Sequence, residues 1–360
     1  MRTHVNSRNM IRTRIIPAGR ADRAGVGGKG VRVRIAIIAT IVAGCVCAGL
    51  LGCRQADPLA QLEAQVRRNP DSLEGLVALG DAYMDAGMHH NAYIQYTRAR
   101  TLAPSSADAL MGLARANQAL GNVTDGLEAA SAAVELQPES AEALNLQADL
   151  LLQAGRPDDA AANYRDVLDA EPGNRDALIG LPTAYLAART VAPAEEAART
   201  AVRRLPDDMD ALLMLAQSLV LQDESAEAET HLRRAIELAP DDARPPFRLA
   251  ELLVRNGRDL EEAVDLAQRS GALDPADGVP ASLAAVALQK LGRPQEGLEV
   301  LHEAALNYPR NIRLWLMMAT MYRELGDEER AARAAAIALQ FAPRRRPGPD
   351  AGSVAVPAGE

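Results

Sequence analysis

The sequence predicts an all-α solenoid, in which pairs of short helices stack on one another along the chain. Prolines recur at a step of 34 residues, with one step of 35, over most of the 360 residues. A period in this range indicates stacked structural repeats. Apolar residues between the prolines are spaced three and four apart, as in Leu127, Ala130 and Val134, which is the periodicity of an amphipathic helix. The series consists of Pro70, Pro104, Pro138, Pro172, Pro206, Pro240, Pro275, Pro309 and Pro343.

The front of the chain has the pattern of a targeting segment. Residues 1–34 carry nine positive charges and one acid, and an uncharged apolar run follows at 35–52. As a helix this run would span about 27 Å, near the minimum for crossing a bilayer. It ends in Leu50-Leu51-Gly52-Cys53, which resembles a bacterial lipobox and implies lipidation of Cys53. We interpret 35–53 as the apolar region and lipobox of a signal peptide; the alternative is an uncleaved transmembrane anchor.

Two further expectations concern this front segment. The basic region 1–34 is long for a signal peptide, and a start at Val31 would give ordinary proportions, so we expect translation to begin downstream of Met1. All three cysteines, Cys45, Cys47 and Cys53, lie in this segment. A mature chain beginning at Cys53 therefore keeps one alkylated sulfur and has no disulfide, thiol nucleophile or cysteine-bound metal.

The segments on either side of the repeats differ from them. Residues 58–72 lead into the first full repeat, and 58–69 has the pattern of a second repeat helix that ends in phase at Pro70. We therefore expect an N-terminal capping helix there. Residues 346–360 are rich in Pro, Gly and small residues and lack helical periodicity, which predicts a disordered tail.

Each 34-residue window fits two helices, the first ended by a turn glycine and the second by the recurring proline. The markers of the first window are Leu79, Gly80, Tyr83, Gly87, Ala92, Tyr96, Ala99 and Pro104. These residues and their spacing resemble the tetratricopeptide repeat (TPR) family. The resemblance covers eight windows over 73–345 and implies a right-handed superhelical solenoid of eight TPR helix pairs. The windows begin at Leu73, Ala107, Ala141, Arg175, Met209, Ala243, Gly278 and Ile312.

Three repeats depart from the pattern. Repeat 4 has Pro182 inside its first helix, where proline costs about 3 kcal/mol, so we expect a kink or a late helix start. Repeats 4 and 5 replace the turn glycine by Arg189 and Asp223. Repeat 6 has one extra residue near 257–260 and begins with Pro245-Pro246, which a helix tolerates only in its first turn.

Charge and motifs exclude several classes of function. The formal net charge is −9, and loss of residues 1–53 removes nine positive charges and one negative charge, leaving −17. Such a balance disfavours nucleic acid and anionic lipid as partners. Neither H-E-x-x-H nor G-x-S-x-G occurs, and His231 and His302 stand alone on their helices. We therefore expect no enzyme activity, no cofactor and no metal site.

Acidic and aromatic residues follow the repeat rather than a catalytic pattern. The second residue of the first five windows is acidic, which favours the positive end of a helix dipole. Tyr83, Tyr185 and Tyr322 share one repeat position, while Tyr96 and Tyr164 share another, which indicates core packing. The five acids are Glu74, Asp108, Glu142, Asp176 and Asp210.

The TPR resemblance implies that the first helices line a concave groove into which repeat positions 2, 5, 9 and 12 point. In repeats 3 to 6 positions 5 and 12 are mainly apolar, and a contiguous exposed apolar strip marks an interaction site. An amphipathic helix or extended apolar peptide is the expected occupant. Alternatively, neighbouring first helices bury these side chains against each other. The predicted groove residues are Asn145, Leu152, Ile179, Leu186, Leu213, Val220, Phe247 and Val254.

The same positions argue against one known kind of ligand. The groove lacks the lysine and asparagine pairs with which chaperone-binding members of the family clamp a terminal carboxylate. Asp81 and Asp149 would repel such a group.

These patterns predict a lipid-anchored TPR scaffold or adaptor for protein–protein interactions in bacterial cell-envelope assembly, such as a pilus, secretion or polysaccharide-export complex. The expected location is the periplasmic face of a membrane, and the expected partner is a protein or peptide in the concave groove, with no nucleic acid. Two alternatives stay open: a periplasmic chaperone-like holder of client proteins, and a non-catalytic accessory subunit of an envelope enzyme.

Overall fold

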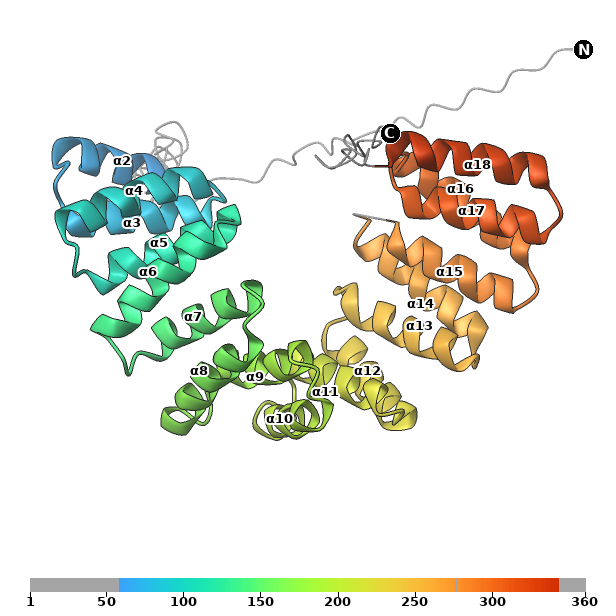
Figure 1. Ribbon diagram of the computed structural model, residues 1–360, viewed down its shortest axis with the longest axis horizontal. Helices are drawn as coiled ribbons and strands as arrows, with labels where there is room; N and C mark the ends of the chain where they lie inside the picture. The colour runs from blue at the N-terminus through green and yellow to red at the C-terminus, as the bar shows by residue number, and fades with distance from the viewer. Residues whose placement is uncertain (1–57, 276–277, 343–360) are drawn as a thin grey trace, which may run out of the picture. The chain divides into compact units, whose positions relative to one another are not determined.

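The computed structural model describes residues 58–275 and 278–342, and throughout these residues the regular secondary structure is α-helical (Figure 1). The chain divides into two compact units, Met1–Gln61 and Leu62–Glu360. The first unit contributes only the start of helix α2 to the described residues. The basic region 1–34, the lipobox segment 35–53 and the tail 346–360 lie outside them, so the expectations for these segments stay predictions.

Seventeen helices are described, α2 to α18. The first helix, α2 (Pro58–Arg68), precedes eight helix pairs that match the eight predicted windows. The first helices of the pairs are α3 (Leu73–Asp85), α5 (Ala107–Leu120), α7 (Ala141–Gln153), α9 (Arg175–Ala187), α11 (Met209–Leu221), α13 (Arg244–Asn256), α15 (Val279–Lys290) and α17 (Ile312–Glu324). The second helices are α4 (His89–Leu102), α6 (Val123–Leu136), α8 (Pro157–Ala170), α10 (Val191–Arg204), α12 (Ser225–Leu238), α14 (Leu260–Leu273), α16 (Pro294–Asn307) and α18 (Glu328–Phe341).

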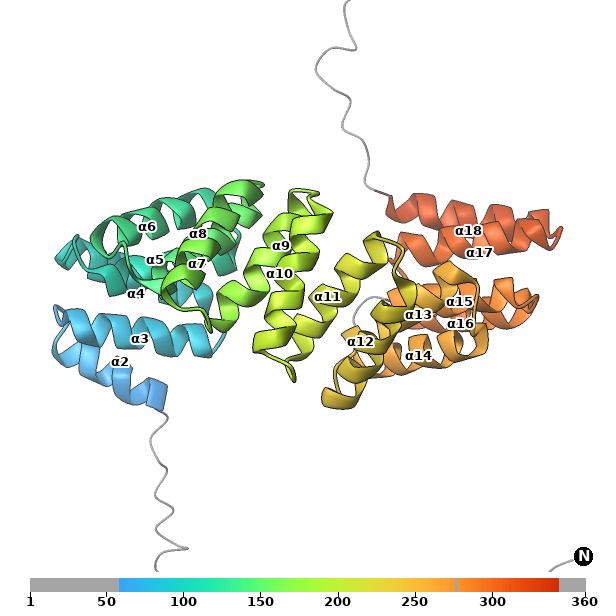
Figure 2. The same cartoon turned by 90° about the horizontal axis from the view of Figure 1, so that it is seen from below.

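The helices of the second unit stack in chain order. From α3 to α18 every helix packs against the next one, and the colours in Figures 1 and 2 follow this order along the chain. First helices of neighbouring pairs also touch, at α3/α5, α5/α7, α7/α9, α9/α11, α13/α15 and α15/α17. Because one pair cannot bury its apolar face alone, the stack supplies the missing partner surfaces. The predicted all-α TPR solenoid is thereby confirmed.

Most first helices begin at a capping side chain. In six of them an oxygen of the residue before the helix accepts a backbone N–H of the first turn, which satisfies a donor that has no partner within the helix. The expected acids stand in the first turns of α3, α5, α7, α9 and α11. The capping residues are Ser72, Ser106, Ser140, Asn174, Asp208 and Asn311.

The departures from the repeat have distinct outcomes. Helix α9 runs without interruption through Pro182, so the expectation of a late helix start is wrong, while a kink stays a prediction. Pro245 and Pro246 lie in the first turn of α13, as expected. Arg189 and Asp223 adopt φ of 60° and 61°, the left-handed conformation that glycine takes in the other turns.

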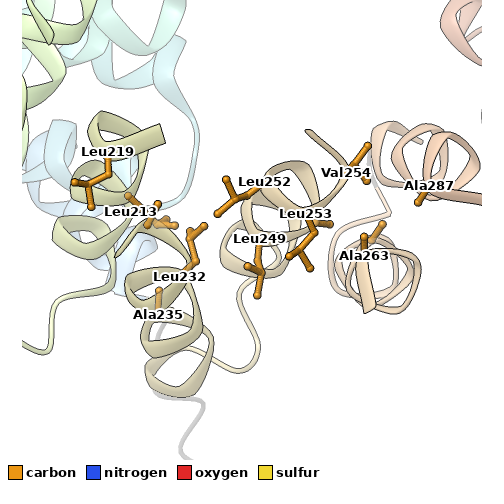
Figure 3. Packing of buried hydrophobic residues seen from close by; sticks show 14 of the residues in the cluster. Leu213, Leu219, Leu232, Ala235, Leu249, Leu252, Leu253, Val254, Ala263 and Ala287 are labelled. Atoms are coloured by element: carbon orange, nitrogen blue, oxygen red, sulfur yellow. The ribbon is translucent and has the colours of Figure 1, made fainter. Parts of the chain in front are cut away.

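The core is a series of local clusters along the stack. Figure 3 shows the cluster that joins repeats 4 to 7, in which Leu232, Leu249 and Leu253 are at most 2% exposed. In the N-terminal half, Tyr96 and Tyr164 are at most 1% exposed, which confirms the expected core role of this repeat position. Their hydroxyls donate hydrogen bonds to Asp81 and Asp149, so the polar ends of both rings are satisfied.

Candidate protein-binding surface

The predicted groove residues are less exposed than the sequence suggested. Asn145, Leu213 and Val254 are buried, with 7%, 8% and 7% exposure, and the other five are half-buried. Neighbouring helices cover much of these side chains, so the strip is only partly exposed, between the two alternatives that the sequence left open. Leu213 and Val254 belong to the cluster of Figure 3, while Leu152 packs on the cluster of repeats 3 and 4.

One part of the predicted strip opens into a groove, which we call the α11–α13 groove. Unlike the other neighbouring first helices, α11 and α13 approach each other only loosely, and a cavity of about 380 Å³ lies between them. Figure 3 shows Leu213 of α11 and Leu252 of α13 gathered with Leu232 where these helices meet. Its apolar lining consists of Leu213, Ala216, Val220, Leu221, Leu232, Leu252, Val254 and Leu283.

The rim of the α11–α13 groove is polar. Gln217, Arg248, Glu251 and Arg255 complete the lining, and Arg248 forms an ion pair with Glu251 at 2.9 Å. The Arg255 guanidinium donates to the Val220 carbonyl oxygen at 3.2 Å and so covers the end of α11. An apolar floor with a few polar groups at its edge is the usual composition of a ligand-binding pocket.

Asn145 lies elsewhere, in a cavity of about 680 Å³ lined by α5, α7 and α9 and by the turns between repeats. We call it the acidic cavity, because five carboxylates line it beside a single cation, Arg115, which pairs with Glu142 at 2.9 Å. The five carboxylates are Glu139, Glu142, Asp149, Glu171 and Asp176.

Burial and a neighbouring carboxylate both act on Asp149. Desolvation by the surrounding protein raises the pKa of its carboxyl above the ordinary value, and the nearby Asp176 carboxylate raises it further. The hydrogen bond from the Tyr164 hydroxyl lowers the pKa but does not cancel these effects. Burial likewise raises the pKa of Tyr164, followed by its bond to Asp149. The acidic cavity is therefore short of positive charge.

The structure thus divides the predicted set. Leu213, Val220 and Val254 meet in the α11–α13 groove, and Asn145 faces the acidic cavity. Phe247 lines a separate hollow of about 170 Å³ with Val279 and Pro280. Leu152, Ile179 and Leu186 line none of these three cavities. Sequence reasoning missed Leu221 and Leu252, since the gap between two helices leaves no mark in the repeat pattern.

Two further observations concern sites that the sequence led us to consider. Among residues 58–275 and 278–342, no group of three or more His, Cys, Asp or Glu side chains is arranged to hold a metal ion. Over the same stretches, none of the helices combines the length and apolar character needed to cross a bilayer. Cys53 lies outside them.

A solenoid of helix pairs with an open groove between first helices defines a repeat scaffold for protein–protein interactions. Profiles of the tetratricopeptide repeat family match residues 78–141, 111–175 and 213–277, and a second profile of that family matches 151–219. Together the matches extend over 78–277, more than half of the chain. The chain belongs to the tetratricopeptide repeat family.

Solved structures agree with this assignment at the level of the fold. A chain of the APC/C hetero-tetramer Cut9-Hcn1 is similar at a TM-score of 0.55 and 16% identity, covering 64% of this chain and 46% of its own. The protein thus spans about half the length of that relative. A tetratricopeptide repeat protein from Parabacteroides merdae is similar at a TM-score of 0.54 and 15% identity, covering 74% of this chain and 98% of its own. No curated protein sequence matches the chain.

Proposed function

We propose that this protein is a lipid-anchored scaffold of a bacterial cell envelope, which holds an apolar segment of a partner protein in the α11–α13 groove. The observation that carries the binding part is the cavity of about 380 Å³ with a mainly leucine and valine lining. Leu221 at its edge is 51% exposed, so part of this apolar surface faces solvent. An amphipathic helix or an extended apolar peptide would cover it and bring its own polar groups to the rim.

The anchoring part rests on the sequence. Leu50-Leu51-Gly52-Cys53 follows a basic region and an apolar run, and acyl chains on Cys53 would each contribute about 0.8 kcal/mol per buried CH₂. Two or three chains hold a protein at a membrane permanently. The scaffold would then present its groove at the periplasmic face, where it serves as an adaptor for an envelope assembly.

Site-specific crosslinking tests the groove. A photoreactive residue at Gln217, which lines the groove, is expected to capture one partner in amounts comparable to the scaffold itself. The same residue at Gln268, exposed on α14 and not part of the groove lining, is the control. Many different proteins captured in small amounts would instead indicate a chaperone-like holder, the alternative that the apolar lining also favours.

Two matched substitutions sharpen this test. Leu221→Glu places a charge on the apolar edge and is expected to abolish capture, because burying an unpaired carboxylate is unfavourable. Leu136→Glu makes the same change at a residue that is 44% exposed on α6, and it should leave capture intact. If a folded Leu221→Glu protein captures its partner as well as the parent, the groove is not the binding site.

The anchor has its own test. Cells that express the full chain should incorporate labelled fatty acid into it, and Cys53→Ser should remove the label and leave an unprocessed precursor. Inhibition of lipoprotein signal peptidase by globomycin should also leave the chain unprocessed, but with the label still on Cys53. An unlabelled, unprocessed parent chain would exclude the lipid anchor and favour the transmembrane one.

A further inference from the structure

We propose that the acidic cavity of α5, α7 and α9 binds an arginine side chain of a partner protein, with Asn145 accepting one of its N–H bonds. This inference rests on the proposed function, that the surface formed by the first helices binds a protein. It adds a second point of contact and defines the chemistry of the partner there. The α11–α13 groove selects an apolar segment, whereas the acidic cavity selects a cation.

The first step is an unsatisfied acceptor. Asn145 is 7% exposed, lines the acidic cavity, and its Oδ1 is buried without a hydrogen-bond partner among the described residues. Its Nδ2 donates to Asn174 Oδ1 at 3.0 Å. Buried polar atoms are nearly always paired, so an unpaired acceptor on a residue that lines a cavity indicates a missing donor.

The surrounding bonds fix the orientation of this amide. Asn174 caps α9, because its Oδ1 accepts the Ala177 N–H at 3.1 Å and its Nδ2 donates to Glu171 at 2.9 Å. The Asn174 atom that faces Asn145 is therefore an acceptor, and Asn145 must donate to it through its Nδ2. Exchanging the oxygen and nitrogen of Asn145 would set two oxygens against each other. The unpaired atom is thus the acceptor, and it requires a donor from outside.

The second step is the charge around that acceptor. Of the five carboxylates, Glu142 is paired with Arg115, while Glu139 and Asp176 have no hydrogen bond or ion pair in the described part of the chain. Asp149 accepts only the neutral Tyr164 hydroxyl among the bonds described for it. A cation in the cavity would relieve the crowding of Asp149 and Asp176.

The third step is the kind of cation. No cluster of three metal-binding side chains is present among the residues described, so a metal ion does not fit the arrangement. A guanidinium carries five N–H donors in a planar fork and can give one to an amide oxygen and others to a carboxylate. A lysine ammonium is more strongly hydrated and has no such fork. Arginine is therefore the side chain that meets both the requirement for a donor and the requirement for positive charge.

The test uses the purified full-length protein and a fluorescent, end-blocked peptide with two arginines among alanines and glycines. A control peptide replaces both arginines by citrulline, which keeps the shape of the side chain and removes its charge. The arginine peptide should bind at least about tenfold more tightly at low ionic strength, as fluorescence anisotropy measures it. Equal binding of the two peptides would overturn the proposal.

Variants locate the binding. Asp149→Asn with Asp176→Asn should weaken the arginine peptide about tenfold or more, while the amide oxygen introduced at position 149 can still accept the Tyr164 hydroxyl. Asn145→Leu should also weaken it about tenfold, because the neutral acceptor is lost. Asp166→Asn with Asp169→Asn makes the same charge change on exposed residues of α8 and should have less than about a twofold effect. If the control variant weakens binding as much as the cavity variants do, the peptide is held by the overall negative charge of the protein, and the acidic cavity is not its binding site.

The two proposals can fail separately. Leu221→Glu changes the α11–α13 groove and should leave the arginine peptide unaffected, whereas the cavity variants should leave the folded scaffold able to present that groove. Thermal melting of each variant confirms folding before binding is compared. If Asn145→Leu does not fold, the Asp149 and Asp176 pair still decides the outcome.

Discussion

At the scale of single residues, the clearest feature is a tyrosine that needs two glycines. Tyr96 on α4 packs against Gly80 in its own repeat and Gly112 in the next, and a Cβ at Gly80 would lie 2.6 Å from the ring. At Gly112 the approach is closer still, and Gly180 faces Tyr164 in the same way. The repeat thus matches a large side chain on one helix with a missing side chain on the neighbouring helix.

Gly112→Ala is therefore expected to lower the free energy of unfolding by about 1–3 kcal/mol, the usual range for overpacking a core. Alanine has a helix propensity about 1 kcal/mol more favourable than that of glycine, which would stabilise the variant. A net decrease in the free energy of unfolding must therefore come from the clash with Tyr96. Urea denaturation measures the change. Gly173→Ala, which has open space around its Cβ, is the control.

A second substitution should rescue the first. Leucine stands at the position of Tyr96 in repeats 5 and 7, as Leu232 and Leu301, and both are buried. Tyr96→Leu removes the ring, so Gly112→Ala should cost much less in that background. An unchanged cost in the double mutant would show that the ring does not impose the glycine.

Turn residues give another prediction at this scale. Arg189 holds φ of 60° where other repeats have glycine, and a side chain in this conformation costs roughly 1–2 kcal/mol. Arg189→Gly removes this strain and should raise the free energy of unfolding by about 0.5–1 kcal/mol. The gain is smaller than the strain energy, because glycine loses more conformational entropy on folding. Arg310→Gly, in a turn without positive φ, should instead be neutral or destabilising, and equal shifts in the melting temperature of both variants would contradict the explanation.

At the scale of helices, Asp208 combines two functions at the start of α11. Its carboxylate accepts the Ala211 N–H at 3.0 Å and the Arg175 Nε–H at 2.6 Å, which links repeat 4 to repeat 5. Burial alone would raise the pKa of Asp208, but the bonds from Arg175 and Ala211 outweigh it and the pKa is lowered. A lowered pKa means that the folded state favours the ionised carboxylate.

This arrangement sets a pH dependence. The stabilisation is present above the unfolded pKa of about 3.9 and is lost as pH falls through the lower folded pKa. Asp208→Asn keeps the cap but loses the charge, so at neutral pH it should cost less than about 1 kcal/mol, since Arg175 is half exposed. Asp208→Ala loses the cap as well and should cost about 1–2 kcal/mol. The difference between parent and Asp208→Asn should shrink as pH falls below the unfolded pKa of about 3.9, and a constant difference at all pH values would exclude the ion pair as its cause.

Helix boundaries also show how far the sequence could lead. Proline and glycine indicated the ends of the helices, because both act on their own backbone. The capping residues Ser72, Ser106 and Ser140 recur at the same 34-residue step and could have been recognised as well. The continuation of α9 through Pro182 could not have been recognised from the sequence. Proline inside a helix is unfavourable by itself, and here α9 packs against α8, α10 and the adjacent first helices, which lie elsewhere in the sequence.

At the scale of the whole molecule, stability is distributed over local clusters. One cluster spans Ala148–Ala184, another Ala198–Leu288 and a third Ala285–Ala334, and the helix contacts lie within a repeat or between neighbouring repeats. Such an array behaves as a sum of repeats and interfaces rather than as one core.

A core cavity should therefore weaken the array near its own position. Leu249→Ala, at a side chain with no exposure, is expected to cost about 2–5 kcal/mol. Hydrogen exchange should show faster amide exchange in α11 to α14, while α3 to α6 keep their protection. Leu314→Ala, equally buried in repeat 8, should move the effect to α15 to α18. Equal loss of protection in all helices from either variant would mean that the array unfolds as a single unit.

The sequence by itself determined the number of repeats, their phase, the family and the acidic balance, because period, backbone breakers and charge are properties of the chain. The phase also identified which positions lie on the face formed by the first helices. Only the tertiary structure decided which of them are open, since exposure depends on how far one helix stands from the next. The loose approach of α11 and α13 left Leu213, Val220 and Val254 around a groove, whereas the turns and helices of three repeats placed Asn145 in a cavity where five carboxylates lie beside one arginine.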